Sequence, residues 1–173
     1  HNFSEWMGVR MALMLYYFSP DATLSADWLP DKLSAKQLTD TELLLASACQ
    51  HVIMELDDRL PEPIDHPFLS WAVQSIHHAH WILSYYRALI AKQKRIFDRD
   101  HRTWKLEHVF GEYVKRFPRV EFKSPPQLIP DDCKASTADE GFRRYFLRCQ
   151  MGIGLYRRVK APFWIDEYYK EPT

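Results

Sequence analysis

The chain has 173 residues, a mass of 20.6 kDa and no net charge, which fits one globular domain with a sizeable core. The sequence has no apolar run long enough to cross a membrane, no visible secretory signal and no Gly-rich phosphate loop. A membrane protein and a P-loop or Rossmann enzyme are therefore excluded. Its three cysteines lack CxxC spacing, and their odd number fits a reducing, cytoplasmic location better than a disulfide framework.

The N-terminal part of the chain divides into two segments. Residues 1–12 contain two methionines, either of which could be a start, so they are interpreted as an N-terminal extension or a cloning remnant. The predicted domain is residues 13–173. It opens with the short apolar run 13–18, which predicts a strand or an extended lead-in because Ser-Pro-Asp follows it.

Two helices are predicted next. Residues 30–38 fit a short helix with a proline in its first turn. Thr39 and Glu42 then fit a capping box, in which each side chain bonds the other residue's backbone N–H at the start of a new helix. Apolar residues keep helical spacing over 41–56, and the Leu-Pro-Glu-Pro turn ends the pattern. Asp40 is therefore expected at the start of this second helix.

A long helix is predicted from Pro67 to about Phe97, because apolar residues recur on one face and basic residues gather at its C-terminal end. The rest of the chain predicts a helix over 104–117, a Pro-rich irregular crossing over 118–135, a helix capped by Ser136 or Thr137 that runs to about Val159, and an aromatic C-terminal tail. This order predicts a single compact all-α domain of four or more helices, with no sheet beyond a short N-terminal pair.

Basic residues are unevenly distributed. Residues 1–86 carry four basic and eleven acidic side chains, whereas residues 87–173 carry nineteen basic and twelve acidic ones. Within the second half, 87–123 has eleven basic against five acidic side chains, and 134–160 has seven against two. Lys and Arg neutralise phosphates, and the aromatic residues in both segments could stack on bases, so this pattern favours a nucleic acid partner. The alternative is an aromatic core covered by long basic side chains.

Two pairs of side chains could carry chemistry. Lys36 and Asp40 are one turn apart if the helix is continuous. They could form a weak ion pair, or place an amine beside a carboxylate that protonates a leaving group or supports an imine. His77 and His80 share a helix face and could bind a metal, but no HExxH or HxE motif accompanies them. We therefore expect no metal and no cofactor.

Several short motifs follow one another over most of residues 13–164. They are Asp21, Ser25-Ala26, Asp31-Lys32, Lys36, Leu44-Leu45-Ala46-Ser47-Ala48, His66-Pro67, Trp71, Ser75, Trp81, His101, Phe142-Arg143-Arg144-Tyr145-Phe146 and Pro162-Phe163-Trp164. In order and spacing they resemble a small family common in phages, the pyrimidine-dimer DNA glycosylase-like proteins of the endonuclease V type.

The resemblance implies an all-α protein that binds double-stranded DNA, extrudes a nucleotide and cleaves a glycosidic bond with its N-terminal amine. It places Asp40 where relatives keep a catalytic glutamate. The chain also begins before the family's usual start, which moves the terminal amine away from the position of the nucleophile. Other family positions differ here, namely Leu33, Val73, His78-Ala79, Lys92-Gln93 and Gln150.

Together these patterns predict a DNA-binding protein that acts on an extruded pyrimidine base in phage or bacterial DNA, as an N-glycosylase or a base-modifying enzyme in the host cytoplasm. The expected catalytic residues are Asp40, Lys36 and His66, with His77 or His78 as alternatives to His66. The expected DNA contacts are Arg95, Arg99, His101, Arg143, Arg144, Arg148, Arg157 and Arg158, and the expected base-stacking rings are Trp71, Tyr145 and Trp164. The alternatives are an inactive DNA-binding protein of the same fold, and a protein that binds another protein through its acidic half.

Overall fold

The computed structural model describes residues 13–99, 104–149 and 155–170, and within them every regular element is a helix. The elements are α2 (Ala22–Asp27), α3 (Asp31–Ile53), α4 (Pro67–Ala72), α5 (Ile76–Phe97), α6 (Trp104–Val114), the 3₁₀ helix η1 (Asp131–Cys133), α7 (Ala138–Cys149) and α8 (Phe163–Lys170). This confirms the predicted all-α fold. None of these helices combines the length and the apolar character that a membrane crossing requires.

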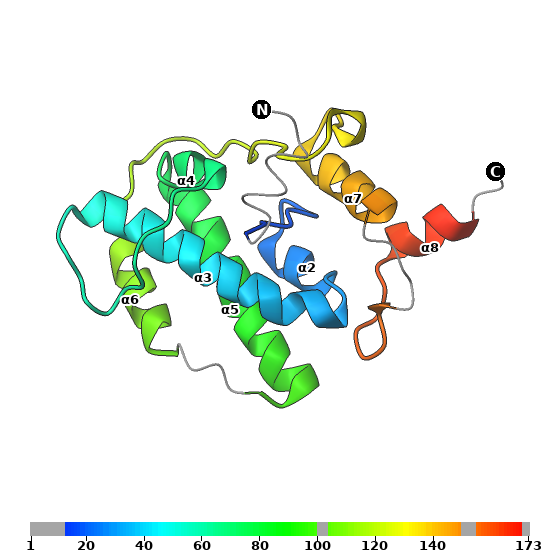
Figure 1. The fold of residues 1–173 in the computed structure, drawn as a ribbon, viewed down its shortest axis with the longest axis horizontal. Helices are drawn as coiled ribbons and strands as arrows, with labels where there is room; N and C mark the ends of the chain where they lie inside the picture. The colour runs from blue at the N-terminus through cyan, green and yellow to red at the C-terminus, as the bar shows by residue number, and fades with distance from the viewer. Residues whose placement is uncertain (1–12, 100–103, 150–154, 171–173) are drawn as a thin grey trace.

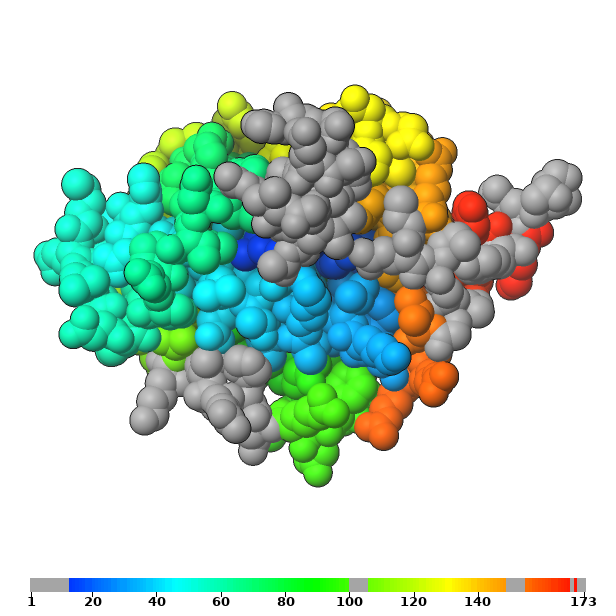
Figure 2. Space-filling view, in the orientation of Figure 1, coloured from blue at the N-terminus to red at the C-terminus, as the bar shows by residue number. Residues whose placement is uncertain are grey.

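Helix α5 packs against helices from several parts of the chain. It contacts α2, α3, α4 and α6. Figure 1 shows α4 and α6 toward one end of the long axis and α7 and α8 toward the other, with α2 between them and α3 running from the α4 end toward α2. In the space-filling view, α3 runs across the visible face (Figure 2). Together α3 and α5 form the centre of the helical packing, since both contact α4 and α6 and also each other.

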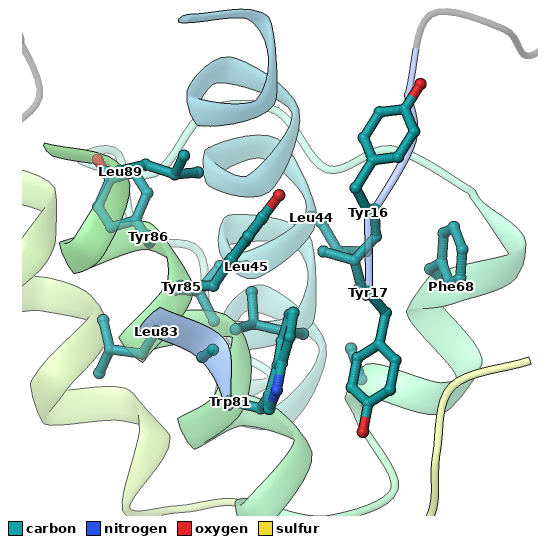
Figure 3. Packing of buried hydrophobic residues seen from close by; sticks show 14 of the residues in the cluster. Tyr16, Tyr17, Leu44, Leu45, Phe68, Trp81, Leu83, Tyr85, Tyr86 and Leu89 are labelled. Atoms are coloured by element: carbon teal, nitrogen blue, oxygen red, sulfur yellow. The ribbon is translucent and has the colours of Figure 1, made fainter. Parts of the chain in front are cut away.

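The N-terminal segment 13–18 is extended and buried, as predicted, but it pairs with no strand among the described residues. Tyr16 and Tyr17 point in opposite directions, as neighbouring side chains of an extended chain do (Figure 3). Because no neighbouring strand satisfies this backbone, side chains of the surrounding helices do so. The Ser25 hydroxyl of α2 accepts from the Phe18 N–H at 2.9 Å and donates to the Tyr16 carbonyl at 2.7 Å.

The capping box predicted at Thr39 and Glu42 is wrong, because α3 continues unbroken through these residues. The Thr39 hydroxyl donates to the Ala35 carbonyl at 3.5 Å, and the Glu42 carboxylate accepts from the Tyr86 hydroxyl at 2.9 Å. The Thr39 hydroxyl thus bonds a carbonyl of its own helix one turn earlier, and Glu42 bonds α5, so neither side chain caps a helix start. Asp40 thus lies inside a 23-residue helix and not at its start.

The single helix predicted from Pro67 to Phe97 is in fact two helices, α4 and α5, separated at residues 73–75. Ser75 has an extended backbone, and its hydroxyl caps α5 by accepting from the His77 N–H at 3.0 Å. The next N–H, that of Ile76, donates to the Pro118 carbonyl at 2.7 Å. The cap and this contact with a distant segment interrupt a helix that apolar periodicity alone would continue.

The C-terminal third departs from the prediction in two places. Helix α7 ends at Cys149, and residues 155–162 lie outside any α-helix, so the helix predicted to reach Val159 is too long. The predicted aromatic tail is instead the helix α8. Its Trp164 ring packs on Phe18 of the N-terminal segment, with ring centroids 5.2 Å apart. The buried Trp164 side chain therefore anchors α8 to the hydrophobic core.

Candidate functional site

Lys36 and Asp40 form an ion pair on one face of α3, at the spacing predicted from the sequence. Lys36 Nζ lies 2.9 Å from Asp40 Oδ2, and Asp40 Oδ2 also accepts from the Met14 N–H at 3.2 Å. Asp40 is 5% exposed, whereas half of the Lys36 side chain is accessible to solvent. The arrangement therefore places a buried carboxyl group beside an amine that reaches the surface.

Burial raises the pKa of Asp40 above its usual value, although the hydrogen bond and charge of Lys36 and the Met14 N–H act in the opposite direction. Because Asp40 lies inside α3 and not at a helix start, no helix N-terminus adjoins it to favour the carboxylate. A raised pKa makes the acid form of a carboxyl group more accessible, which is the direction that general acid catalysis requires. The neighbouring amine could hold an anion or attack an electrophilic carbon.

Gln37 is a buried polar residue of this face that the sequence analysis did not select. Its amide oxygen accepts from the Tyr16 N–H at 3.0 Å and from the Tyr85 hydroxyl at 2.8 Å, and its amide nitrogen donates to the Met14 carbonyl at 2.5 Å. Burial raises the pKa of Tyr85 well above its usual value, and the charge of Asp40 contributes to this shift. The signal for Gln37 in the sequence was a polar side chain on the apolar face of a helix.

His66 caps the start of α4. Its Nδ1 accepts from the Phe68 N–H at 3.1 Å, and its ring stacks on that of Phe68 with centroids 5.4 Å apart. His78, the alternative proton carrier, is buried against Trp71. Its Nδ1 lies 2.6 Å from the Trp71 carbonyl, and its Nε2 accepts from the Lys123 N–H. Burial lowers the pKa of His78. The described hydrogen bonds of both histidines are to backbone groups, those of His66 within α4 and those of His78 to Trp71 and to the distant Lys123.

A cavity of about 370 Å³ lies between α7 and α8, and we call it the arginine groove. Its lining includes Glu140, Arg143, Arg144, Arg148, Trp164 and Tyr168. Arg144 and Arg148 are exposed, and each uses Nη1 to donate to a carbonyl near η1, that of Lys134 at 3.0 Å and that of Asp132 at 2.6 Å. A guanidinium has five N–H donors, so both can also bind an anion such as phosphate. The structure thus brings three of the predicted DNA contacts together.

Arg143 has a structural role that the sequence analysis did not foresee. Its Nε donates to the Phe18 carbonyl at 2.8 Å. Its guanidinium carbon lies 4.9 Å from the ring centre of Trp28 and 5.7 Å from that of Trp164. Arg143 therefore joins α7 and α8 to the N-terminal segment and to the turn after α2, by charge and by cation–π contact.

Replacing Arg143 with alanine is expected to lower the free energy of unfolding by about 2 kcal/mol, because a hydrogen bond from a charged donor and a partly buried cation–π contact are both lost. Arg144→Ala serves as the matched control, since exposed Arg144 should change stability by less than about 0.5 kcal/mol. Urea denaturation of both variants provides the comparison. Equal midpoints for the two variants would contradict the structural role of Arg143.

A second group of predicted DNA contacts surrounds Phe97 at the C-terminal end of α5. The guanidinium carbons of Arg99 and Arg158 each lie 5.9 Å from the centre of the Phe97 ring. Arg95, on the same helix, lies 3.6 Å from the Asp27 carboxylate. Arg157 precedes Arg158 in a segment outside any helix, and His101 lies outside the described residues. Arg157 and Arg158 therefore do not lie on the helix that was predicted to run to about Val159.

The three rings predicted to stack on bases are all buried. Trp71, Tyr145 and Trp164 are 4%, 1% and 6% exposed, respectively. Trp71 is fixed further, because its ring stacks on His78 at 4.4 Å and its Nε1 donates to the Lys123 carbonyl at 2.7 Å. Rings buried to this extent expose little surface to a nucleobase, and of the three only Trp164 lines the arginine groove, so base stacking by these residues stays a prediction. Their aromatic character serves the core, the alternative that the sequence left open.

Comparisons with protein-family models, curated proteins and solved structures found no match to this chain. The described part of the chain contains no group of three or more His, Cys, Asp or Glu side chains arranged to hold a metal ion. The geometry of the Asp40–Lys36 pair and of the arginine groove is therefore the basis for a functional proposal.

Proposed function

We propose that this protein binds double-stranded DNA and acts on a pyrimidine base extruded from it, with Asp40 as the proton carrier and Lys36 as the neighbouring amine. The observation that carries the proposal is the pair itself. A carboxyl group that is 5% exposed, with a pKa raised by burial, lies 2.9 Å from an amine whose side chain is half exposed.

The Asp40–Lys36 pair has the functional groups that cleavage of the glycosidic bond between base and sugar requires. In its acid form, Asp40 can protonate a leaving base, and as a carboxylate it can stabilise positive charge on the sugar. The Lys36 ammonium can hold a phosphate, and in its neutral form it could form an imine with an opened sugar. The sequence resemblance to DNA glycosylase-like proteins supports the same assignment for Asp40.

DNA contact is assigned to the arginine groove, because Arg144 and Arg148 project from α7 with donors that suit phosphate. Each phosphate contact releases counterions, so removal of one contact lowers the slope of log affinity against log salt by roughly one unit. We expect Arg144→Ala and Arg148→Ala each to weaken binding and to reduce this slope, as measured by fluorescence anisotropy with a labelled duplex at several salt concentrations.

Lys115→Ala is the control for that titration, since Lys115 is an exposed cation after α6 and is not among the residues of the arginine groove. Its slope should equal that of the unmodified protein. If Arg144→Ala and Arg148→Ala also leave both affinity and slope unchanged, the arginine groove is not a DNA-binding surface.

A second candidate function is DNA binding without catalysis. The observation in its favour is that Asp40 Oδ2 accepts from the Met14 N–H, a bond that fixes the buried N-terminal segment. In this case the Asp40–Lys36 pair stabilises the fold, and the arginine groove alone carries the function. Replacement of Asp40 separates the two candidate functions. It lowers the rate of base processing if the protein is an enzyme, and a protein that only binds DNA has no such rate to lose.

A further inference from the structure

A second cavity, of about 540 Å³, lies between α2, the end of α5 and the start of α8, and we call it the α2–α8 cavity. Its lining includes Asp27, Trp28, Arg95, Lys160, Phe163 and Asp166. Its volume lies within the range of small-molecule sites, roughly 300–1,000 Å³. None of its residues belongs to the Asp40–Lys36 pair.

One wall of this cavity, the turn after α2, is held by two buried polar groups. The ammonium of Lys92, whose side chain is fully buried, donates to the carbonyls of Ala26 and Leu29 at 2.8 Å each. The Tyr156 hydroxyl donates to the Trp28 carbonyl at 2.5 Å. Burial of a lysine is costly. Here the buried ammonium group fixes the backbone from Ala26 to Leu29, so this wall of the cavity is held in one position.

The opposite wall is held by a carboxylate. Asp31, at the start of α3, accepts from the backbone N–H groups of Arg157, Arg158 and Val159 at 2.8–3.2 Å. This fixes the segment that continues through Lys160 to Phe163, the orange segment below α8 in Figures 1 and 2. The Tyr156 hydroxyl also joins this segment to the turn after α2, so polar contacts hold both sides of the cavity and connect them without a bound ligand.

The lining combines aromatic surface with charges of both signs. Phe163 is 56% exposed, and its ring lies 5.9 Å from that of Trp28 at 80°, so a planar group can rest on one ring and meet the edge of the other. Lys160 can bind phosphate, and so can Arg95 through donors other than the one that lies 3.6 Å from Asp27. The Asp166 carboxylate, and that of Asp27 beside its pair with Arg95, can accept from the amino group of a base.

We propose that the α2–α8 cavity binds one nucleotide, with the base against Phe163 and Trp28 and the phosphate at Lys160 and Arg95. This nucleotide is either free, or an unpaired nucleotide of DNA other than the one proposed to react at Asp40, because the cavity contains neither Asp40 nor Lys36. The chemistry of recognition is the same in both cases. The site stands on its own residues and holds even if the arginine groove does not bind DNA.

The test is calorimetric titration of the full chain with dCMP, whose amino group can donate to Asp27. Because stacking contributes roughly 1–3 kcal/mol per base, Phe163→Ala is expected to weaken binding about fivefold to a hundredfold. Lys160→Ala should weaken it further through the phosphate. Leu56→Ala and Lys115→Ala are the matched controls, because both remove an exposed side chain outside the cavity and should leave dCMP binding unchanged.

Competition identifies the source of the nucleotide. Displacement of dCMP by a duplex with one unpaired cytosine, but not by a fully paired duplex, assigns the site to a base extruded from DNA. If neither duplex displaces dCMP, the site is assigned to a free nucleotide. The proposal is overturned if the unmodified protein does not bind dCMP at millimolar concentration, or if Phe163→Ala and Lys160→Ala bind it as tightly as the controls do.

Discussion

Replacement of Lys92 with alanine is expected to lower the free energy of unfolding by about 3 kcal/mol at pH 7.5. The fully buried side chain leaves a void, and the carbonyls of Ala26 and Leu29 lose a donor at 2.8 Å. These losses exceed the relief of no longer burying an ammonium group. Lys94→Ala, at an exposed position of the same helix, is the matched control and should change stability by less than about 0.5 kcal/mol.

The stability deficit of Lys92→Ala should also grow with pH. Burial lowers the pKa of Lys92 to about 8 from 10.5, so the unfolded chain binds this proton more tightly than the folded protein does. Stability of the unmodified protein therefore rises with pH between about 8 and 10.5, while the alanine variant lacks this rise. Urea denaturation at pH 7.5, 8.5 and 9.5 measures the difference. A deficit that stays constant or shrinks would contradict the charged, desolvated state of Lys92.

Replacement of Asp40 with asparagine is expected to reduce the rate of base processing by roughly a hundredfold or more, while affinity for DNA is retained. Asparagine has nearly the same size and keeps an oxygen for the Met14 N–H, but it cannot carry the proton. Asp65→Asn, at an exposed carboxylate, is the control and should keep the full rate. A rate that is unchanged in Asp40→Asn would show that this carboxyl group takes no part in the chemistry.

The same variant is expected to unfold at a higher temperature than the unmodified protein at pH 7. Because burial raises the pKa of Asp40, the folded protein binds this proton more tightly than the unfolded chain does. The stability from this group is full below the unfolded pKa and is lost as pH rises through the folded pKa. Asparagine stays neutral and avoids the loss. A lower melting temperature would favour the structural role of Asp40, in which its carboxylate only supports the N-terminal segment.

The all-α fold class was predictable because the helical spacing of apolar residues can be recognised within each segment alone. The helix boundaries were not, because they depend on contacts between segments that are distant in the sequence. Beside the Ser75 cap, the Ile76 N–H bonds the Pro118 carbonyl, and within the unbroken α3, Glu42 bonds the Tyr86 hydroxyl of α5. No local pattern contains this information, so the sequence predicted a break where α3 is continuous and a continuous helix where α4 ends.

The candidate site was predictable where two residues lie on one helix. The spacing of Lys36 and Asp40 gave their ion pair directly. In contrast, the sequence could not distinguish a basic side chain that faces solvent from one that closes the core, as Arg143 does over Trp28. Lys92 was likewise read as one member of a basic cluster, although its ammonium group is buried under the turn after α2.

The most direct measurement of the central proposal is mass spectrometry of nucleosides and released bases after incubation with plain, ultraviolet-irradiated and hypermodified phage DNA. We expect a released pyrimidine, or a nucleoside of altered mass, from at least one of these DNAs. The product should appear with the unmodified protein and with Asp65→Asn, and it should be lost with Asp40→Asn. If the protein binds all three DNAs and changes none of them, it is a DNA-binding protein without this chemistry, and the proposed role of Asp40 and Lys36 is contradicted.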